Sequence, residues 1–265
     1  MPNERQPLLG VIGGVGPYAG LDFIRKIFMN TNAVKDQDHL SCILVSCPSI
    51  IPDRTAFLLQ NEGESENPAF GMFECAGLLH KAGVYYAAVA CNSAHSKRIF
   101  FPFCEMVRKS LPGLEIVNML QTCARFAKAS LAKESSTGEK IRIGLLATIG
   151  THKSRVYHEY LKEEDNFQLL EPEKDGQEKI HSAIYSEEYG IKAHSLDIKP
   201  RARDIILREI SGLVERGAKA VILGCTELPL AVQRADCNAP IIDQSLVTAR
   251  KFIELAAPEK LKETF

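Results

Sequence analysis

The sequence lacks an excess of either charge and lacks any long basic run. Its 32 Lys and Arg residues nearly balance its 33 Asp and Glu residues, which gives a formal net charge of −1. No run of lysine or arginine is longer than two residues. Because binding to nucleic acid or to an anionic membrane depends on clustered positive charge, we expect neither as a partner.

Long apolar stretches and paired-cysteine motifs are also missing. No stretch approaches the roughly 20 consecutive apolar residues that a membrane span requires, and residues 1–7 lack the apolar core of a secretory signal. The 8 cysteines stand at irregular spacing, which is typical of free thiols in a reducing compartment. We therefore expect a cytoplasmic location, and nothing in the cysteine spacing supports a metal site.

The sequence contains an internal repeat. Cys91 and Cys225 each end an apolar run, and they are 134 positions apart. The same offset of 134 separates three pairs of glycines, namely Gly10 and Gly144, Gly16 and Gly150, and Gly83 and Gly217. A constant offset over four landmarks indicates two similar halves.

Short apolar runs alternate with helical patterns along both halves. The predicted strands are 8–13, 40–47, 85–90, 115–119, 141–147, 167–170, 220–224 and 239–243. The predicted helices are 18–30, 69–82, 93–111 with an interruption at Pro102, a helix ending near Lys162, parts of 180–188, 201–216 and 245–256. Irregular segments are predicted at 48–55, 60–68, 130–140 and 171–179. Such alternation predicts an α/β fold with parallel sheets covered by helices on both faces.

The repeat and the alternation together predict two similar Rossmann-like domains related by internal duplication, with the active site in the cleft between them. Residues 1–116 with 241–265 would form the first domain, which carries Cys91, and residues 117–240 the second, which carries Cys225. Ligands of such folds bind at the carboxyl ends of the strands. Both cysteines and both glycine turns fall at those ends.

The two cysteines suit proton transfer at a carbon atom. Each falls between a predicted strand and a predicted helix start, where the partial charge of the helix N-terminus favours a thiolate. Each also has an ionisable neighbour, His95 for Cys91 and Glu227 for Cys225. If the halves face each other, one sulfur could remove a proton from a small ligand and the other could return one from the opposite side, which is the geometry of racemisation.

A substrate of that reaction must be anchored, because misplacement of the reacting carbon is costly. Arg54 can hold a carboxylate with two hydrogen bonds. Further candidates are hydroxyl and amide side chains, the backbone of the glycine turns and, more weakly, one lysine: Gly14, Val15, Asn92, Ser93, Thr148, Gly150, Thr151, Lys179 and Thr226.

Five segments spread over nearly the whole chain carry a family resemblance. They are 10–17 (GVIGGVGP), 51–56 (IPDRTA), 91–95 (CNSAH), 145–151 (LLATIGT) and 224–227 (GCTE). In these segments the sequence resembles the aspartate/glutamate racemases, and most closely the cofactor-independent aspartate racemases. The two cysteine motifs in their correct order are specific, whereas the glycine turn alone is not.

The resemblance implies roles for single residues. Cys91 and Cys225 would be the catalytic thiols, and Glu227 and His95 would tune the proton transfer. Arg54 would anchor the side-chain carboxylate of a small acidic amino acid. The α-carboxylate and amine would be bound by Asn92, Ser93 and Thr226, and Lys179 matches a lysine of the family only loosely.

The resemblance also implies a homodimer that uses neither pyridoxal phosphate nor a metal. One departure is Ser93, where the family usually has threonine; the hydroxyl is kept. Some relatives retain only one of the two cysteines, so the presence of both favours an intact racemase.

Other interpretations remain open from the sequence. Residues 14–19 (GVGPYA) match a loose dinucleotide-binding pattern, but the second strand ends in Ser46-Cys47-Pro48 without the acidic residue that would hold a ribose. The chain could instead be a non-catalytic acidic amino-acid sensor, or an isomerase of a related diacid. His95 could be a core histidine, Glu227 a partner of a helix dipole and Arg54 a solvated loop residue, and the other six cysteines are expected to be small core side chains.

Overall fold

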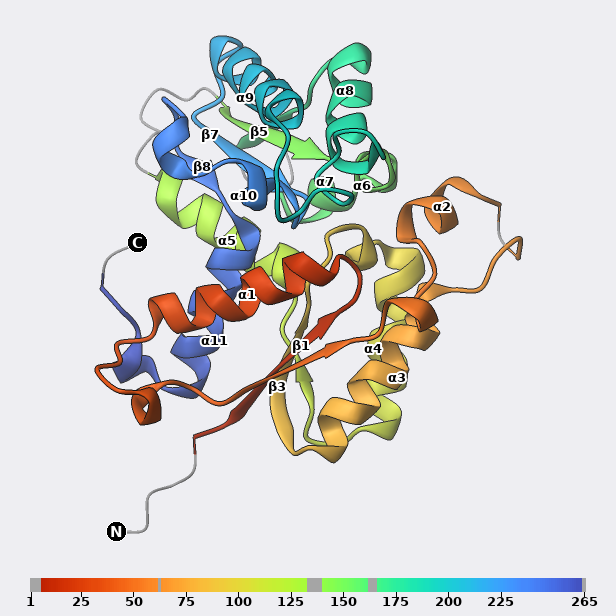
Figure 1. Cartoon of the computed structure of the whole chain (residues 1–265), viewed down its shortest axis with the longest axis vertical. Helices are drawn as coiled ribbons and strands as arrows, with labels where there is room; N and C mark the ends of the chain where they lie inside the picture. The colour runs from red at the N-terminus through yellow and green to blue at the C-terminus, as the bar shows by residue number, and fades with distance from the viewer. Residues whose placement is uncertain (1–5, 62, 133–139, 162–165, 264–265) are drawn as a thin grey trace.

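The computed structural model describes residues 6–61, 63–132, 140–161 and 166–263. Its strands form two four-stranded parallel sheets, ordered β2-β1-β3-β4 and β6-β5-β7-β8. The two sheets have the same strand order, which agrees with the internal duplication. Figure 1 shows the two α/β domains stacked on each other, with the second domain at the top. The predicted fold of two similar parallel-sheet domains is confirmed.

The first domain contains the strands β1 (Leu8–Gly13), β2 (Cys42–Ser46), β3 (Val84–Val89) and β4 (Glu115–Ile116). Its helices are α1 (Pro17–Asn30), the short α2 (Arg54–Leu59), α3 (Pro68–Lys81) and α4 (Lys97–Ser110). Single 3₁₀ turns lie at Asp36–Asp38, Pro48–Ile50 and Ser93–His95.

The second domain contains β5 (Ile141–Ala147), β6 (Phe167–Leu170), β7 (Ala220–Gly224) and β8 (Ile241–Ile242). Its helices are α5 (Met119–Leu131), α6 (Ile149–Ser154), α7 (Val156–Tyr160), α8 (Lys174–Tyr185), α9 (Pro200–Glu215) and α10 (Leu228–Ala231). The last helix, α11 (Gln244–Ala256), follows β8, and further 3₁₀ turns lie at Arg234–Asp236 and Pro258–Lys260. Within the described residues, no helix combines the length and the apolar character that a membrane span requires.

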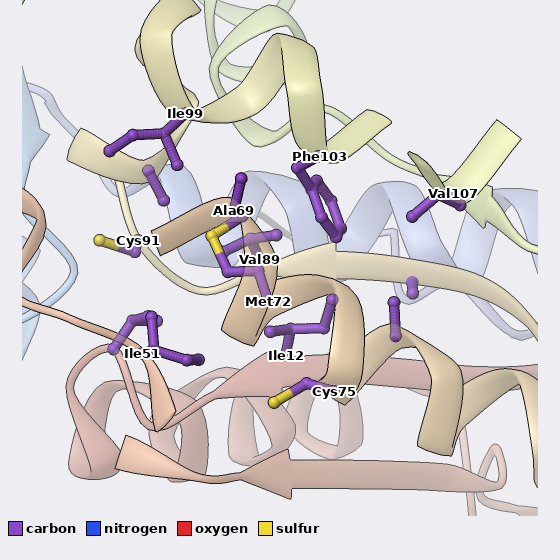
Figure 2. Packing of buried hydrophobic residues seen from close by; sticks show 14 of the residues in the cluster. Ile12, Ile51, Ala69, Met72, Cys75, Val89, Cys91, Ile99, Phe103 and Val107 are labelled. Atoms are coloured by element: carbon purple, nitrogen blue, oxygen red, sulfur yellow. The ribbon is translucent and has the colours of Figure 1, made fainter. Parts of the chain in front are cut away.

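Alternation along the strands gives each sheet two hydrophobic cores. In β7, Ala220 and Ile222 join the core beneath α5 and α7, whereas Val221 and Leu223 join the core beneath α8 and α9. The first sheet lies in the same way between α3 and α4 on one face and α1 and α11 on the other. Figure 2 shows the core on the α3 and α4 face, with Cys91 at one end of it. Since both faces of each sheet are covered, the short strands read as apolar runs in the sequence.

Two connections join the domains. The chain passes into the second domain at α5, and β8 pairs with β7 in the second sheet before α11 packs against α1. In Figure 1, α11 and α1 lie side by side below the second domain. Strand pairing therefore places Ile241–Ile242 in the second sheet. The chain was expected to return to the first domain at residue 241, but it does so only with α11, after this strand. The domain boundaries otherwise stay a prediction.

Several predicted element bounds are wrong in detail. Segment 48–55 was predicted to be irregular, but α2 starts at Arg54, because Asp53 caps it by accepting a hydrogen bond from the Ala56 N–H at 2.7 Å. The strand predicted at 115–119 ends at Ile116, and α5 follows from Met119. The helix predicted after Thr151 is divided into α6 and α7 at Arg155, whose φ of 52° is left-handed. Its predicted end near Lys162, and most of segment 130–140, lie outside the described residues.

Pro102 does not interrupt its helix as predicted, because the proline lies inside a continuous α4. A proline has no N–H to donate to the carbonyl four residues earlier, which is that of Arg98. The Asn67 side chain supplies the missing donor, since its Nδ2 donates to the Arg98 carbonyl at 2.8 Å. The Asn67 Oδ1 also caps α3 by accepting from the Ala69 N–H at 3.0 Å. One asparagine side chain thus pairs with backbone groups of both α3 and α4.

We predict that Asn67→Ala lowers the free energy of unfolding by about 2 kcal/mol, because it removes a helix cap and leaves the Arg98 carbonyl without its donor. Urea denaturation followed by circular dichroism measures this loss. Asn61→Ala is the control, since Asn61 is exposed and its side chain bonds to Glu64, three residues away. Equal stability of the two variants would show that Asn67 does not compensate for Pro102.

Candidate active site

The two cysteines lie at the carboxyl ends of equivalent strands. Cys91 follows β3 and Cys225 follows β7, and both are buried, with 6% and 4% of their surface exposed. The two motifs contact each other directly, because the Thr226 hydroxyl donates to the Ala90 carbonyl at 3.1 Å. Both sulfur-bearing residues line one small chamber between the domains.

Cys225 is bonded to a buried carboxylate. Its Sγ donates to Glu227 Oε2 at 2.9 Å, and the Thr226 hydroxyl lies 3.3 Å from the same oxygen. The other oxygen, Oε1, forms an ion pair with Lys192. Burial raises the pKa of the Cys225 thiol well above its usual value, and the charge of Glu227 raises it further. Both effects favour the protonated thiol, which agrees with the sulfur acting as hydrogen-bond donor.

Lys192 keeps Glu227 ionised. Burial alone would raise the pKa of Glu227, but the Lys192 ammonium and the hydrogen bond from Cys225 lower it below its usual value. Burial likewise disfavours the Lys192 ammonium, and the opposite charge of Glu227 raises the pKa of Lys192 above its usual value. Each charge of the pair therefore favours the ionised form of the other.

Cys91 has a different partner. Its Sγ lies 3.3 Å from the Ser93 Oγ. The repeat offset of 134 aligns Ser93 with Glu227, so each cysteine contacts the residue two positions later: a hydroxyl in the first domain and a carboxylate in the second. The Arg54 guanidinium is also a neighbour of Cys91. Burial disfavours the charge of Arg54, but Cys91 and Asp53 raise the pKa of Arg54 above its usual value.

Arg54 is held in place by backbone carbonyls. Its Nη2 donates to the Val15 carbonyl at 2.8 Å and its Nη1 to the Pro52 carbonyl at 3.2 Å. The side chain is buried, and its Nε has no hydrogen-bond partner among the described residues. An oriented, buried guanidinium with a donor to spare can bind an anion.

His95 is placed behind the chamber rather than in its wall. Its Nδ1 lies 2.7 Å from the Cys91 carbonyl, and its Nε2 accepts from the Met119 N–H at 3.3 Å. Both ring nitrogens are therefore used by backbone groups, and the ring stacks on Phe100. Burial lowers the pKa of His95 to about 4. This geometry suits a neutral histidine that fixes the Cys91 loop to the start of α5.

The glycine turns bring the domains into close contact. A Cβ at Gly16 would lie 2.1 Å from Glu227 Oε1, and a Cβ at Gly150 would lie 2.9 Å from the backbone of Thr55. Beside Gly150, the Thr148 hydroxyl caps α6 by accepting from the Thr151 N–H at 3.3 Å. Only glycine fits where the turn of one domain meets a residue of the other.

The structure brings most of the predicted residues together in the chamber wall. The chamber measures about 10 Å³ and is lined by Val15, Arg54, Cys91, Asn92, Ser93, Thr148, Thr151, Tyr185, Lys192, Cys225, Thr226 and Glu227. A second hollow of about 200 Å³ shares Arg54, Lys192 and Glu227 and is otherwise lined by Gly14, Gly16, Pro17, Tyr18, Ala19 and Ser195. Among the predicted residues, Gly14 belongs to the hollow and Gly150 to the contact with Thr55.

Lys179 does not reach the site. It is exposed on α8 and lines neither cavity. Lys192 stands at the site instead, on the segment after α8, where its N–H bonds to the Ile184 carbonyl. Neither Lys192 nor Tyr185, whose hydroxyl lies 3.2 Å from Thr55 Oγ1, carries a periodic or spacing signal in the sequence. Only the fold of α8 and of the segment that follows it, residues 186–199, shows their location.

Comparison with known proteins identifies the family and the fold. The family model described as Asp/Glu/Hydantoin racemase matches residues 12–252. The structure is similar to Picrophilus torridus aspartate racemase, with a TM-score of 0.77 and 29% identity over 97% of this chain and 96% of that one. It is also similar to an aspartate racemase homologue from Pyrococcus horikoshii OT3, with a TM-score of 0.67 and 25% identity over 94% and 98% of the chains. The broad specificity amino-acid racemase RacX of Bacillus subtilis (strain 168) is 23% identical over 93% of this chain and 96% of its own length.

The family model and the similarity to Picrophilus torridus aspartate racemase together define an isomerase of the racemase class. The match over residues 12–252 makes the assignment specific: the chain belongs to the Asp/Glu/hydantoin racemase family.

The neutral state of His95 leads to a prediction about acid stability. Its pKa is about 4 in the folded protein and about 6.5 when unfolded, so the unfolded chain binds more protons between these values and stability rises with pH there. We expect His95 alone to lower the free energy of unfolding by about 3 kcal/mol as the pH falls from 6.5 to 4. Urea titrations at several pH values measure this slope.

His95→Asn should flatten that slope, although it lowers stability at neutral pH. His80→Asn is the control, because His80 is partly exposed and its ring bonds to the Pro112 carbonyl at the surface. An unchanged slope in His95→Asn would mean that another group causes the acid sensitivity.

Proposed function

We propose that the enzyme interconverts the L and D forms of an acidic amino acid, with aspartate as the first candidate, through proton transfer between Cα and two cysteines. The observation that carries the proposal is the chamber that Cys91 and Cys225 line from opposite domains, together with Arg54. The similarity to Picrophilus torridus aspartate racemase and to the aspartate racemase homologue from Pyrococcus horikoshii OT3 supports aspartate as the first candidate.

Proton transfer in this site starts from a defined state. Because the Cys225 Sγ–H donates to Glu227, Cys225 holds the proton to be delivered, and Cys91 is the base that first removes the Cα proton. The carbanion then takes the Cys225 proton on its opposite face. The enantiomer that is formed leaves Cys91 protonated and Cys225 as thiolate, and the reverse reaction uses the same groups in the opposite roles.

The charges around the chamber suit a dicarboxylate. Arg54, which is buried, and Lys192, which is partly exposed, supply two cations beside the buried carboxylate of Glu227. We assign the side-chain carboxylate of the substrate to Arg54 and Lys192. The α-carboxylate and amine go to Asn92, Ser93 and Thr226, as the family resemblance implies. The reaction in this scheme needs no cofactor, and we retain the predicted homodimer and cytoplasmic location as parts of the proposal.

The chamber must widen to admit a substrate. A volume of about 10 Å³ holds about one water molecule, whereas the adjoining hollow measures about 200 Å³. The substrate would enter through the hollow, because Arg54, Lys192 and Glu227 line both cavities. Contacts across the domains, such as the Tyr185 hydroxyl with Thr55, would break as the chamber opens.

The decisive experiment is incubation with L-aspartate in deuterated water. We expect deuterium at Cα and loss of optical rotation in wild type. Cys91→Ala and Cys225→Ala should each lower racemisation by about 10²–10⁴-fold, because one acid/base group is lost. Cys237→Ala is the control, since Cys237 lies outside both cavities.

Intact L-aspartate after long incubation would refute aspartate racemisation, and the same assay on glutamate and related diacids would then test the other substrates. Ligand binding seen by thermal shift without exchange would identify a sensor instead of an enzyme. Full activity in both single-cysteine variants would rule out the two-thiol mechanism.

Glu227→Gln tests the control of the Cys225 proton. Removing the carboxylate charge should lower the pKa of the Cys225 thiol, because that charge raises it in wild type, and we expect kcat to fall about 10²-fold. The pH dependence of Cys225 alkylation by iodoacetamide, followed by mass spectrometry, should shift to lower pH. Glu209→Gln on α9 is the control, and an alkylation profile equal to that of the control would exclude the assigned role of Glu227.

A further inference from the structure

The Asn92 side chain has one satisfied end and one unsatisfied end. Asn92 lines the chamber beside Cys91 and is only 2% exposed. Its Oδ1 accepts a hydrogen bond from the Tyr157 hydroxyl at 2.5 Å. Its Nδ2 is buried and has no hydrogen-bond partner among the described residues. A buried amide donor without a partner is costly and calls for a ligand acceptor.

Tyr157 reaches Asn92 from the other domain. It belongs to α7 of the second domain, is 1% exposed and is not part of the chamber wall. Burial raises the pKa of the Tyr157 hydroxyl well above its usual value, so the hydroxyl keeps its proton. When this hydroxyl donates, the atom facing it must be the amide oxygen, because Nδ2 has no acceptor lone pair. The Nδ2 group is thereby turned away from Tyr157.

We propose that Tyr157 is a positioning residue for substrate binding: it fixes the Asn92 amide so that Nδ2 donates to the α-carboxylate of the amino acid. A carboxylate only accepts hydrogen bonds, so it complements an unpartnered amide donor and would repel the oxygen of a flipped amide. The inference rests on the proposed function. It also makes recognition of the α-carboxylate depend on the two domains being in contact.

The chain contains a matched control on the same helix. Tyr160 also bonds to an asparagine, since Asn118 Nδ2 donates to its hydroxyl at 2.8 Å. Asn118 caps α5 and lines neither cavity. Tyr157→Phe and Tyr160→Phe therefore each remove one tyrosine–asparagine bond from α7, and only the first acts on a residue of the chamber.

The test compares ligands with and without an α-carboxylate. L-Aspartate carries it, whereas β-alanine keeps the amine and the distal carboxylate but lacks the α-carboxylate. We expect Tyr157→Phe to raise the KM and the Kd for L-aspartate roughly tenfold, because a charge-assisted hydrogen bond is weakened. Binding of β-alanine, measured by NMR titration, should stay within about twofold in the same variant. Tyr160→Phe should leave both affinities unchanged.

A double-mutant cycle adds an independent measurement. If Tyr157 acts through Asn92, Tyr157→Phe should cause no further loss of L-aspartate affinity in an Asn92→Ala background. Additive losses would overturn the proposal. An equal loss of L-aspartate and β-alanine affinity would also overturn it, because general damage to the chamber would explain both.

Failure of the proposed function is distinguishable from failure of this inference. If wild type binds no acidic amino acid, the proposed function fails, and the ¹⁵N and ¹H signals of the Asn92 side-chain amide still report its environment. The inference then requires Tyr157→Phe to shift these signals and Tyr160→Phe to leave them in place. Unshifted Asn92 signals in Tyr157→Phe would overturn it.

Discussion

The hydrogen bond from the Thr226 hydroxyl to the Ala90 carbonyl joins the two cysteine motifs at 3.1 Å, and the site depends on that junction. It ties the carboxyl end of β7 to the carboxyl end of β3, so the residues that follow these strands share one chamber. Bare glycines at positions 16 and 150 permit the approach, since a side chain at either would strike the opposite domain. Close contact of two similar halves thus brings two buried cysteines into the wall of one chamber.

The duplicated halves are not chemically equal. Ser93 and Glu227 are equivalent by the repeat, yet one presents a hydroxyl and the other a carboxylate to its cysteine. A buried carboxylate is stable only with a partner, and Lys192 supplies it from the segment after α8. Arg54 places the other cation beside Cys91. The asymmetry gives the two sulfurs different partners within a symmetrical fold, and under the proposed mechanism it separates the resting acid from the resting base.

Sequence patterns predict an element correctly where its own residues determine its structure. The strands 141–147, 167–170 and 220–224 have their predicted bounds, because residues buried on both faces of a sheet form short apolar runs between turn residues. Local reasoning failed where distant groups intervene. Pro102 was predicted to break its helix, but the Asn67 side chain satisfies the carbonyl that the proline leaves unpaired. His95 looked like an acid/base neighbour of Cys91, yet its ring nitrogens face the Cys91 carbonyl and the Met119 amide.

By itself, the sequence determined the two-domain α/β architecture and the pairing of Cys91 with Cys225, because a repeat offset and strand periodicity are properties of the chain. Only the tertiary structure decided which side chains surround the sulfurs. Lys192 and Tyr157 follow no periodic rule, and they reach Glu227 and Asn92 only after the chain has folded back on itself. The hydrogen bonds and charges of the site act over a few ångströms in space, so contacts between segments 35 or 65 residues apart are not visible in the order of the amino acids.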